Sequence, residues 1–209
     1  MPTYLHATLT AKPGRLDELG ETVAHVSRGM RQRGMRLLGA LRTVDADPGG
    51  MVDLWEVPDA NTVVEALDEA ARHPSHPAVM TRLARSLDDE VLQILRPAPD
   101  APTVDLSTGV GCLHRQLVHR VRYGETGRFQ DRRRAGLDRL QGETGWSLVA
   151  TFTAGIGGLC DVYEIWRTPD AGTAPTTTAL EESDDAVLGC TGTSLTLLPW
   201  SVPEGATHS

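Results

Sequence analysis

The residues best suited to chemistry occur as two similar sets, one in each half of the 209-residue chain. Each set combines a histidine in an early extended segment with a carboxylate and a tryptophan two positions apart. The members are His6, Asp53 and Trp55 in the first half, and His114, Glu164 and Trp166 in the second. A carboxylate can hold a histidine in one tautomer so that the ring acts as a general base, and an indole gives a flat substrate an apolar wall. The sets therefore predict acid/base chemistry on a hydrophobic small molecule.

The recurrence of these sets indicates an internal repeat. A Leu-His pair opens each half, a Gly-Gly pair precedes each tryptophan, and Pro-Asp-Ala follows each tryptophan, at 58–60 and 169–171. Between the halves lies a segment rich in proline and alanine, which is typical of a linker. We therefore expect a first repeat over residues 1–97, a linker over 98–108, and a second repeat over 109–209 with a shortened second helical region.

Hydrophobic periodicity predicts the same order of elements in both repeats: strand, helix, strand, strand, helix, strand. The second helical region of the second repeat is short of residues and rich in threonine, so we expect a mobile loop and an entrance at 172–185. In the first repeat Asn61 is the expected N-cap of the second helix, and His73-Pro74 is expected to end it. The helix after the first strand of the second repeat is expected as one segment, over 125–141.

Alternation along the strands predicts which side chains face away from the helices. Leu5 and its alternate neighbours are apolar, so Tyr4, His6 and Thr8 are expected on the other face, and His114 and Gln116 likewise. On the third strand of each repeat we expect the carboxylate and the tryptophan to face inward as well. The candidate catalytic residues are His6, His114, Asp53 and Glu164, the candidate substrate-binding residues are Tyr4, Trp55, Trp166 and Gln116, and no metal site is expected.

A four-stranded sheet with helices on one face leaves an apolar face that needs a partner, and a second copy in the same chain supplies it. This arrangement resembles the dimeric α+β barrel superfamily, and the pairs Leu54-Trp55 and Ile165-Trp166 resemble its NIPSNAP-like branch. The resemblance implies an α+β fold in which two tandem ferredoxin-like βαββαβ units pack sheet to sheet around a central cavity. Families with this fold differ widely in activity, so the fold alone does not fix the function.

The predicted function is a cofactor-independent enzyme that cyclises or dehydrates a hydrophobic, polyketide-like molecule in the barrel cavity by acid/base catalysis. One alternative is a cofactor-free monooxygenase, and another is a non-catalytic binding or structural protein whose barrel is filled by its own side chains. Cavity volume separates these hypotheses, because a small-molecule site needs roughly 300 to 1,000 Å³ close to the candidate residues.

Composition narrows the possible partners. The chain is 40% hydrophobic and 23% charged with a net charge of −8, which is typical of a soluble globular protein and disfavours nucleic-acid binding. The basic run Arg132 to Arg134 is expected to be a solvated helix face, and His119 an edge or surface residue. The three cysteines show no metal-binding or disulfide spacing, and no apolar stretch or leader suggests a membrane. We therefore expect a cytoplasmic protein with a hydrophobic small-molecule substrate and a possible homo-oligomeric state.

Overall fold

The computed structural model describes residues 2–44, 49–99, 101–107, 112–156, 160–168 and 185–201. The first repeat contains β1 (Thr3–Ala11), α1 (Leu16–Gln32), β2 (Arg36–Thr43), β3 (Gly50–Val57), α2 (Ala60–Arg72), α3 (His76–Ser86) and β4 (Leu87–Pro97). The second contains β5 (Leu113–Val121), α4 (Thr126–Ala135), α5 (Leu137–Thr144), β6 (Ser147–Ile156), β7 (Asp161–Arg167) and β8 (Val187–Leu197), followed by the 3-10 turn η3 (Pro199–Ser201). The expected entrance at 172–185 lies outside the described residues, apart from Asp185.

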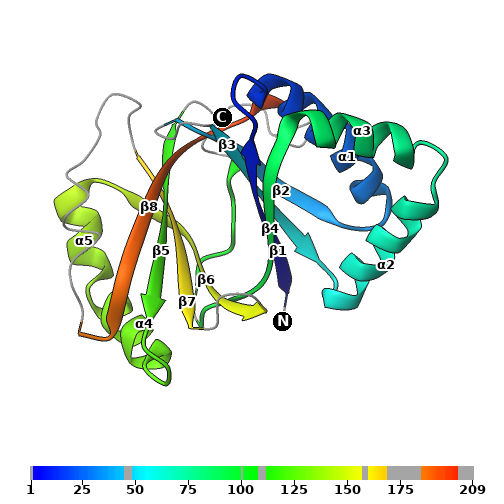
Figure 1. Ribbon diagram of the computed structural model, residues 1–209. Helices are drawn as coiled ribbons and strands as arrows, with labels where there is room; N and C mark the ends of the chain where they lie inside the picture. The colour runs from blue at the N-terminus through cyan, green and yellow to red at the C-terminus, as the bar shows by residue number, and fades with distance from the viewer. Residues whose placement is uncertain are drawn as a thin grey trace.

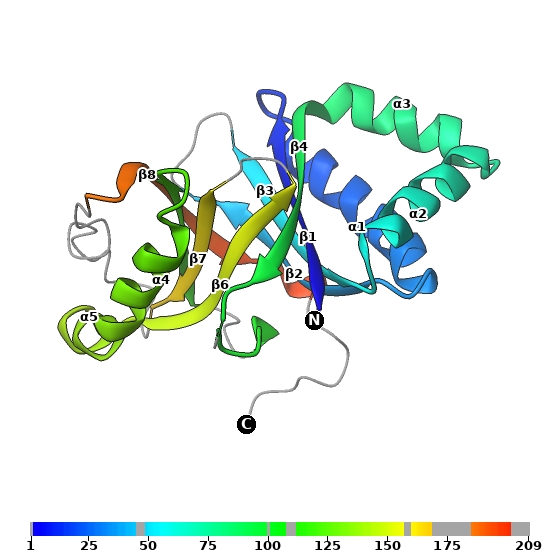
Figure 2. The same cartoon turned by 90° about the horizontal axis from the view of Figure 1, so that it is seen from below.

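The eight strands form one closed antiparallel barrel in the order β1-β3-β2-β8-β5-β7-β6-β4. Each repeat supplies four neighbouring strands, and the two sets join where β2 meets β8 and where β4 meets β6. Helices α1 to α3 cover one half of the barrel from outside, and α4 and α5 cover the other half (Figures 1 and 2). The expected α+β fold of two tandem units packed sheet to sheet is confirmed.

Local sequence explains three features of the helices. In α1 the buried residues Leu19, Val23 and Met30 follow helical spacing and face the sheet. The N-cap of α2 is Asp59 rather than the expected Asn61, because the Asp59 carboxylate accepts hydrogen bonds from the backbone of Asn61 at 2.7 Å and of Thr62 at 3.0 Å. The single helix expected over 125–141 is divided at Gly136 into α4 and α5, and glycine is a weak helix former.

The barrel interior is filled by side chains. Tyr4 on β1 packs against Phe152 on β6, over the strand β4 that lies between them, with ring centroids 4.9 Å apart, and leucines of both repeats surround them. The linker contributes to this core, because Val104 and Leu106 are buried in the same cluster. Gly39 leaves room for the linker: a Cβ there would lie 2.8 Å from a methyl carbon of Leu106. The linker therefore packs against the barrel core and is more than a tether.

Strand register corrects one expectation about side-chain direction. His6 lies opposite Leu54, and Leu5 lies opposite Trp55, so a histidine and a tryptophan of one set cannot share a face. The interior cluster contains Val52 and Leu54, whereas Trp55 packs with the helices. Strand β3 is buried on both faces for most of its length, so its sequence carries no alternation from which the direction could be predicted.

Candidate functional site

The two predicted sets are split between the faces of the sheets. His6, His114, Tyr4 and Gln116 face the barrel interior, as expected. The expectation that Asp53, Trp55, Glu164 and Trp166 face inward is wrong, since all four lie on the helix-covered side. The cause in β7 is the same as in β3: Asp161–Trp166 is buried throughout and gives no alternation.

His6 belongs to a small polar cluster at the centre of the barrel. Its Nε2 lies 2.9 Å from Oε1 of Gln116, and its ring centroid lies 5.2 Å from that of Tyr163. The hydroxyl of Tyr163 donates to Oε1 of Gln93 at 2.6 Å. Burial lowers the pKa of His6, and the amides of Gln116 and Gln93 offset this only in part. His6 is therefore a neutral, tightly packed imidazole.

His114 is fully buried on the same interior face. Burial, followed by the nearby charge of Arg167, lowers its pKa to about 4. Among the described residues, no carboxylate forms a hydrogen bond with His6 or His114. The histidine–carboxylate pairs expected from the sequence therefore do not form with these two histidines.

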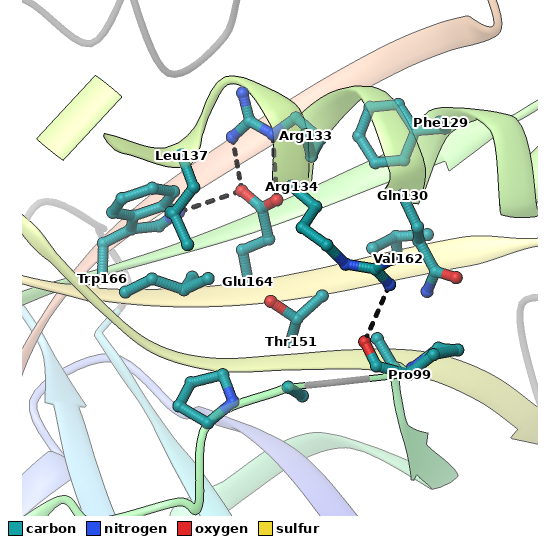
Figure 3. A pocket seen from close by; sticks show the side chains of 14 residues that line it. Pro99, Phe129, Gln130, Arg133, Arg134, Leu137, Thr151, Val162, Glu164 and Trp166 are labelled. Atoms are coloured by element: carbon teal, nitrogen blue, oxygen red, sulfur yellow. Dashed lines mark hydrogen bonds and ion pairs between the residues drawn. The ribbon is translucent and has the colours of Figure 1, made fainter. Parts of the chain in front are cut away.

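A histidine, a carboxylate and a tryptophan do come together in the second repeat, on the helix side of the sheet. Arg133 donates through Nε to Oε1 of Glu164 at 2.9 Å and through Nη2 to Oε2. Trp166 Nε1 donates to Oε2 at 2.9 Å, and His119 Nε2 lies 3.3 Å from the same oxygen. Figure 3 shows the Arg133 and Trp166 interactions meeting at the carboxylate. Only the histidine differs from the predicted set, since His119 replaces His114.

The partners of Glu164 determine its charge. Burial by itself raises the pKa of this carboxyl, but the hydrogen bonds and charges of His119 and Arg133 outweigh burial and hold the pKa at about 2. Glu164 is therefore ionised at neutral pH and is a weak proton acceptor. Its role is to anchor the guanidinium of Arg133, which also lies over the Trp166 ring with its central carbon 5.9 Å from the ring centroid.

Two members of this cluster contradict the sequence expectations. The Arg132–Arg134 run is not uniformly solvated, because the Arg133 side chain is only 16% exposed. His119 is buried, because β5 lies inside the sheet between β8 and β7. The sequence does carry a signal for Arg133: it lies four residues after Phe129 on α4, so the two side chains share one helix face, and Phe129 is buried.

A pocket opens beside this cluster, between α4, α5 and the sheet. Its volume is about 60 Å³. We call it the Glu164 pocket, and Figure 3 shows its lining residues: Ala98, Pro99, Ala101, Pro102, Phe129, Gln130, Arg133, Arg134, Leu137, Leu148, Thr151, Val162, Glu164 and Trp166. The linker forms one wall, which is fixed by a bond from Arg134 to the Pro99 carbonyl at 3.0 Å and by one from the Ala98 amide to Thr151 at 2.9 Å.

The polar groups of the Glu164 pocket are mainly donors. Its charged lining residues are two arginines, Arg133 and Arg134, and one glutamate, Glu164, so the lining is net positive in a chain of net charge −8. Gln130 Nε2 is buried and has no hydrogen-bond partner among the described residues. A buried donor without a partner costs about 1–3 kcal/mol, which a ligand acceptor could offset. The remaining walls are largely apolar.

The corresponding place in the first repeat lacks such a cluster. Asp53 occupies the position equivalent to Glu164 but lies between Ala7 and Ala40 on the neighbouring strands. Its Oδ1 is buried without a partner among the described residues, and burial, followed by the charge of Glu90, raises its pKa to about 7. Trp55 packs into the apolar layer beneath α1 and α2. The duplication has therefore kept the residue types but not their interactions.

In the part of the chain that the structure describes, no three His, Cys, Asp or Glu side chains are grouped closely enough to hold a metal ion. The described helices include none with the length and apolar character needed to cross a membrane.

Comparisons with solved structures identify the architecture. An anthrone oxidase-like protein aligns with 94% of this chain and 91% of its own, at 12% identity and a TM-score of 0.62. A putative monooxygenase from Lactobacillus acidophilus aligns with 94% of this chain and 93% of its own, at 12% identity and a TM-score of 0.60. The fold is that of the dimeric α+β barrels.

This α+β barrel also resembles shorter proteins. A NIPSNAP domain protein from Burkholderia xenovorans aligns with 48% of this chain and 99% of its own, at 20% identity and a TM-score of 0.41. At 12% identity, the likeness to the two longer structures concerns the fold alone. No protein-family model and no curated protein matches the sequence.

Proposed function

We propose that this α+β barrel is a cofactor-free enzyme that holds the oxygen-bearing edge of a hydrophobic aromatic molecule in the Glu164 pocket and stabilises its anion. The observation that carries the proposal is the convergence of Arg133, His119 and Trp166 on one buried carboxylate at the wall of an otherwise largely apolar pocket. The proposed site therefore lies on the helix side of the second repeat, and not in the barrel interior, where the sequence analysis expected it.

The electrostatics favour stabilisation of an oxyanion over direct base catalysis. Glu164 keeps its charge and holds Arg133 in place, while Arg134 and the Gln130 amide add donors to the same lining. Fixed donors in a site that excludes water stabilise an enolate or phenolate and lower the pKa of the bound acid. The substrate proton then leaves to solvent, and the anion remains in the pocket.

Pocket size limits what can enter. A volume of about 60 Å³ is well below that of a typical site for a whole small molecule. Only the carbonyl or hydroxyl edge of a ring would therefore enter, with the ring body lying across the linker residues Pro99, Ala101 and Pro102. A carbonyl oxygen in this position would accept the hydrogen bond that the buried Gln130 Nε2 lacks, once a rotation of the Gln130 side chain turns its amide towards the pocket.

Oxygenation is the reaction that we favour for the bound anion. The carbanion form reduces O₂ to give a hydroperoxide at that carbon, and loss of water leaves a carbonyl, so one oxygen atom enters the product and the other enters water. Fold-level analogy supports this choice, because the similar structures are named as a putative monooxygenase and an anthrone oxidase-like protein. Cyclisation or dehydration would proceed from the same anion.

The test uses anthrone as the probe and follows oxygen consumption and product formation above the uncatalysed rate. Gln130→Leu removes the donor while keeping the approximate volume, and we expect a loss of about tenfold in kcat/KM. Gln32→Leu on exposed α1 is the matched control and should leave the rate unchanged. Equal rates in both variants would contradict the assignment of the site.

A non-catalytic binding or structural role is the second candidate, because the barrel interior is filled and the Glu164 pocket is small. If the protein is non-catalytic, the wild-type protein should show no turnover above background. In that case Gln130→Leu should change stability alone.

A further inference from the structure

A second and larger concave site lies in the first repeat. Helices α1 to α3, which surround it, lie on the opposite side of the barrel from α4 and α5, which flank the Glu164 pocket (Figure 1). The groove runs between the C-terminal half of α1 and the connection from α2 to α3, and its volume is about 480 Å³. This volume is within the range of small-molecule sites. The connection that follows the expected helix end at His73-Pro74 forms one of its walls, through His73, Ser75 and His76.

The charge of the groove differs from that of the whole molecule. Its lining contains two arginines, Arg28 and Arg33, and no aspartate or glutamate, although the chain as a whole carries a net charge of −8. Arg33 is already engaged, since it donates to Glu69 at 3.0 Å and to the Gly29 carbonyl at 2.8 Å. Arg28 is exposed and lies beside His25.

Two histidines in the lining present donors to the groove. Arg28 Nη2 lies 3.1 Å from Nδ1 of His25, and because a guanidinium can only donate, Nδ1 is the acceptor. The backbone N–H of Ser75 donates to Nδ1 of His73 at 3.2 Å. In a neutral imidazole whose Nδ1 accepts, the proton is carried by Nε2. His25 and His73 therefore each keep one N–H donor for another partner.

The remaining surface of the groove is apolar. Val26, Met30, Ala70 and Val79 contribute aliphatic or thioether surface to the lining. A ligand that matches this lining needs acceptor oxygens with negative charge at one end and an apolar body at the other. A guanidinium beside N–H donors is a recurrent arrangement for binding carboxylates.

We propose that the groove between α1 and the α2–α3 connection binds an organic carboxylate with an apolar body, with Arg28, His25 and His73 holding the carboxylate. The site is separate from the Glu164 pocket and does not depend on the function proposed for that pocket.

The experiment titrates the full-length protein with benzoate, benzyl alcohol and inorganic phosphate, and follows binding by calorimetry and by backbone NMR shifts of α1. We expect saturable binding of benzoate, with binding of benzyl alcohol and phosphate at least about tenfold weaker. Benzyl alcohol lacks the negative charge, and phosphate lacks the apolar body. Arg28→Gln should weaken benzoate binding by about tenfold. Arg31→Gln changes an exposed arginine of the same helix outside the groove lining and should leave the affinity unchanged.

Three outcomes would overturn the proposal. Equal losses in Arg28→Gln and Arg31→Gln would indicate a general charge effect. Binding of phosphate as tight as that of benzoate would show that the groove does not recognise an apolar body. Unchanged benzoate binding in a His25→Leu, His73→Leu double variant that keeps its thermal stability would remove the histidines from the site.

Discussion

Arg133 of α4 and Glu164 of β7 form a two-point ion pair across the layer between helix and sheet, and both of its partners are largely withdrawn from solvent. The Glu164 side chain is only 2% exposed. Such a pair gains little over apolar packing, yet removing one partner leaves an uncompensated buried charge. The pair therefore fixes α4 over the sheet in one position, which in turn defines the Glu164 pocket.

Replacing Glu164 by glutamine should lower the free energy of unfolding by about 3–5 kcal/mol at pH 7, because Arg133 loses its counter-charge. Denaturant titration measures this change. Glu143→Gln, which removes the partner of exposed Arg139 within α5, is the control and should cost less than about 1 kcal/mol. Similar small costs for both variants would show that the buried pair does not hold α4 in place.

The ionisation of Glu164 should also make the stability of the protein depend on pH. Its folded pKa of about 2 lies below the ordinary value of 4.5, so its contribution is present above pH 4.5 and is lost as the pH falls towards 2. The stability difference between the wild-type protein and Glu164→Gln should therefore narrow over this interval. A difference that stays constant from pH 6 to pH 3 would contradict the assigned ionisation.

Asp53, in the first repeat, should give stability the opposite dependence on pH. Its folded pKa of about 7 lies above the ordinary value of 3.8, so stability is lost as the pH rises from about 4 to 7. Asp53→Asn cannot ionise and should be more stable than the wild-type protein at pH 8, by up to roughly 4 kcal/mol. Thermal unfolding at pH 4 and pH 8 measures the change. Asp88→Asn, at an exposed position on β4, is the control and should show little difference between the two pH values.

The architecture could be predicted from the sequence because duplication and strand–helix periodicity are visible in the order of residue types alone. Side-chain direction could be predicted on β1, where apolar and polar residues alternate around His6. It could not be predicted on β3 and β7, where both faces are buried and Trp55 or Trp166 fits either face. Trp166 was expected beside Glu164, but the pairing of Arg133 and His119 with Glu164 could not be predicted, because these two residues reach it only through the packing of α4 and β5.

The linker should contribute to stability as a core element. Leu106 is 1% exposed in the barrel cluster and packs close to Gly39. Leu106→Ala should cost about 2–5 kcal/mol of unfolding free energy, which is the range for a buried leucine. Val44→Ala, at a side chain that is 52% exposed, is the control and should change stability by less than about 0.5 kcal/mol. Matching small effects would mean that the linker only rests on the barrel.

His114 should limit stability on the acid side. Its folded pKa of about 4 lies below the ordinary value of 6.5, so the unfolded chain binds the proton more readily, and stability is lost as the pH falls from 6.5 to 4. This loss amounts to roughly 3 kcal/mol from His114 alone. His114→Leu removes the titrating group at similar volume and should reduce the slope of unfolding free energy against pH between pH 4 and 6.5. Part of this slope should remain, because burial also lowers the pKa of His6. Denaturant titrations between pH 4 and 7 measure the change, with exposed His25→Leu as the control. An unchanged slope in His114→Leu would show that His114 is not held neutral in the barrel. A slope reduced equally by His25→Leu would assign the effect to the net charge of the chain.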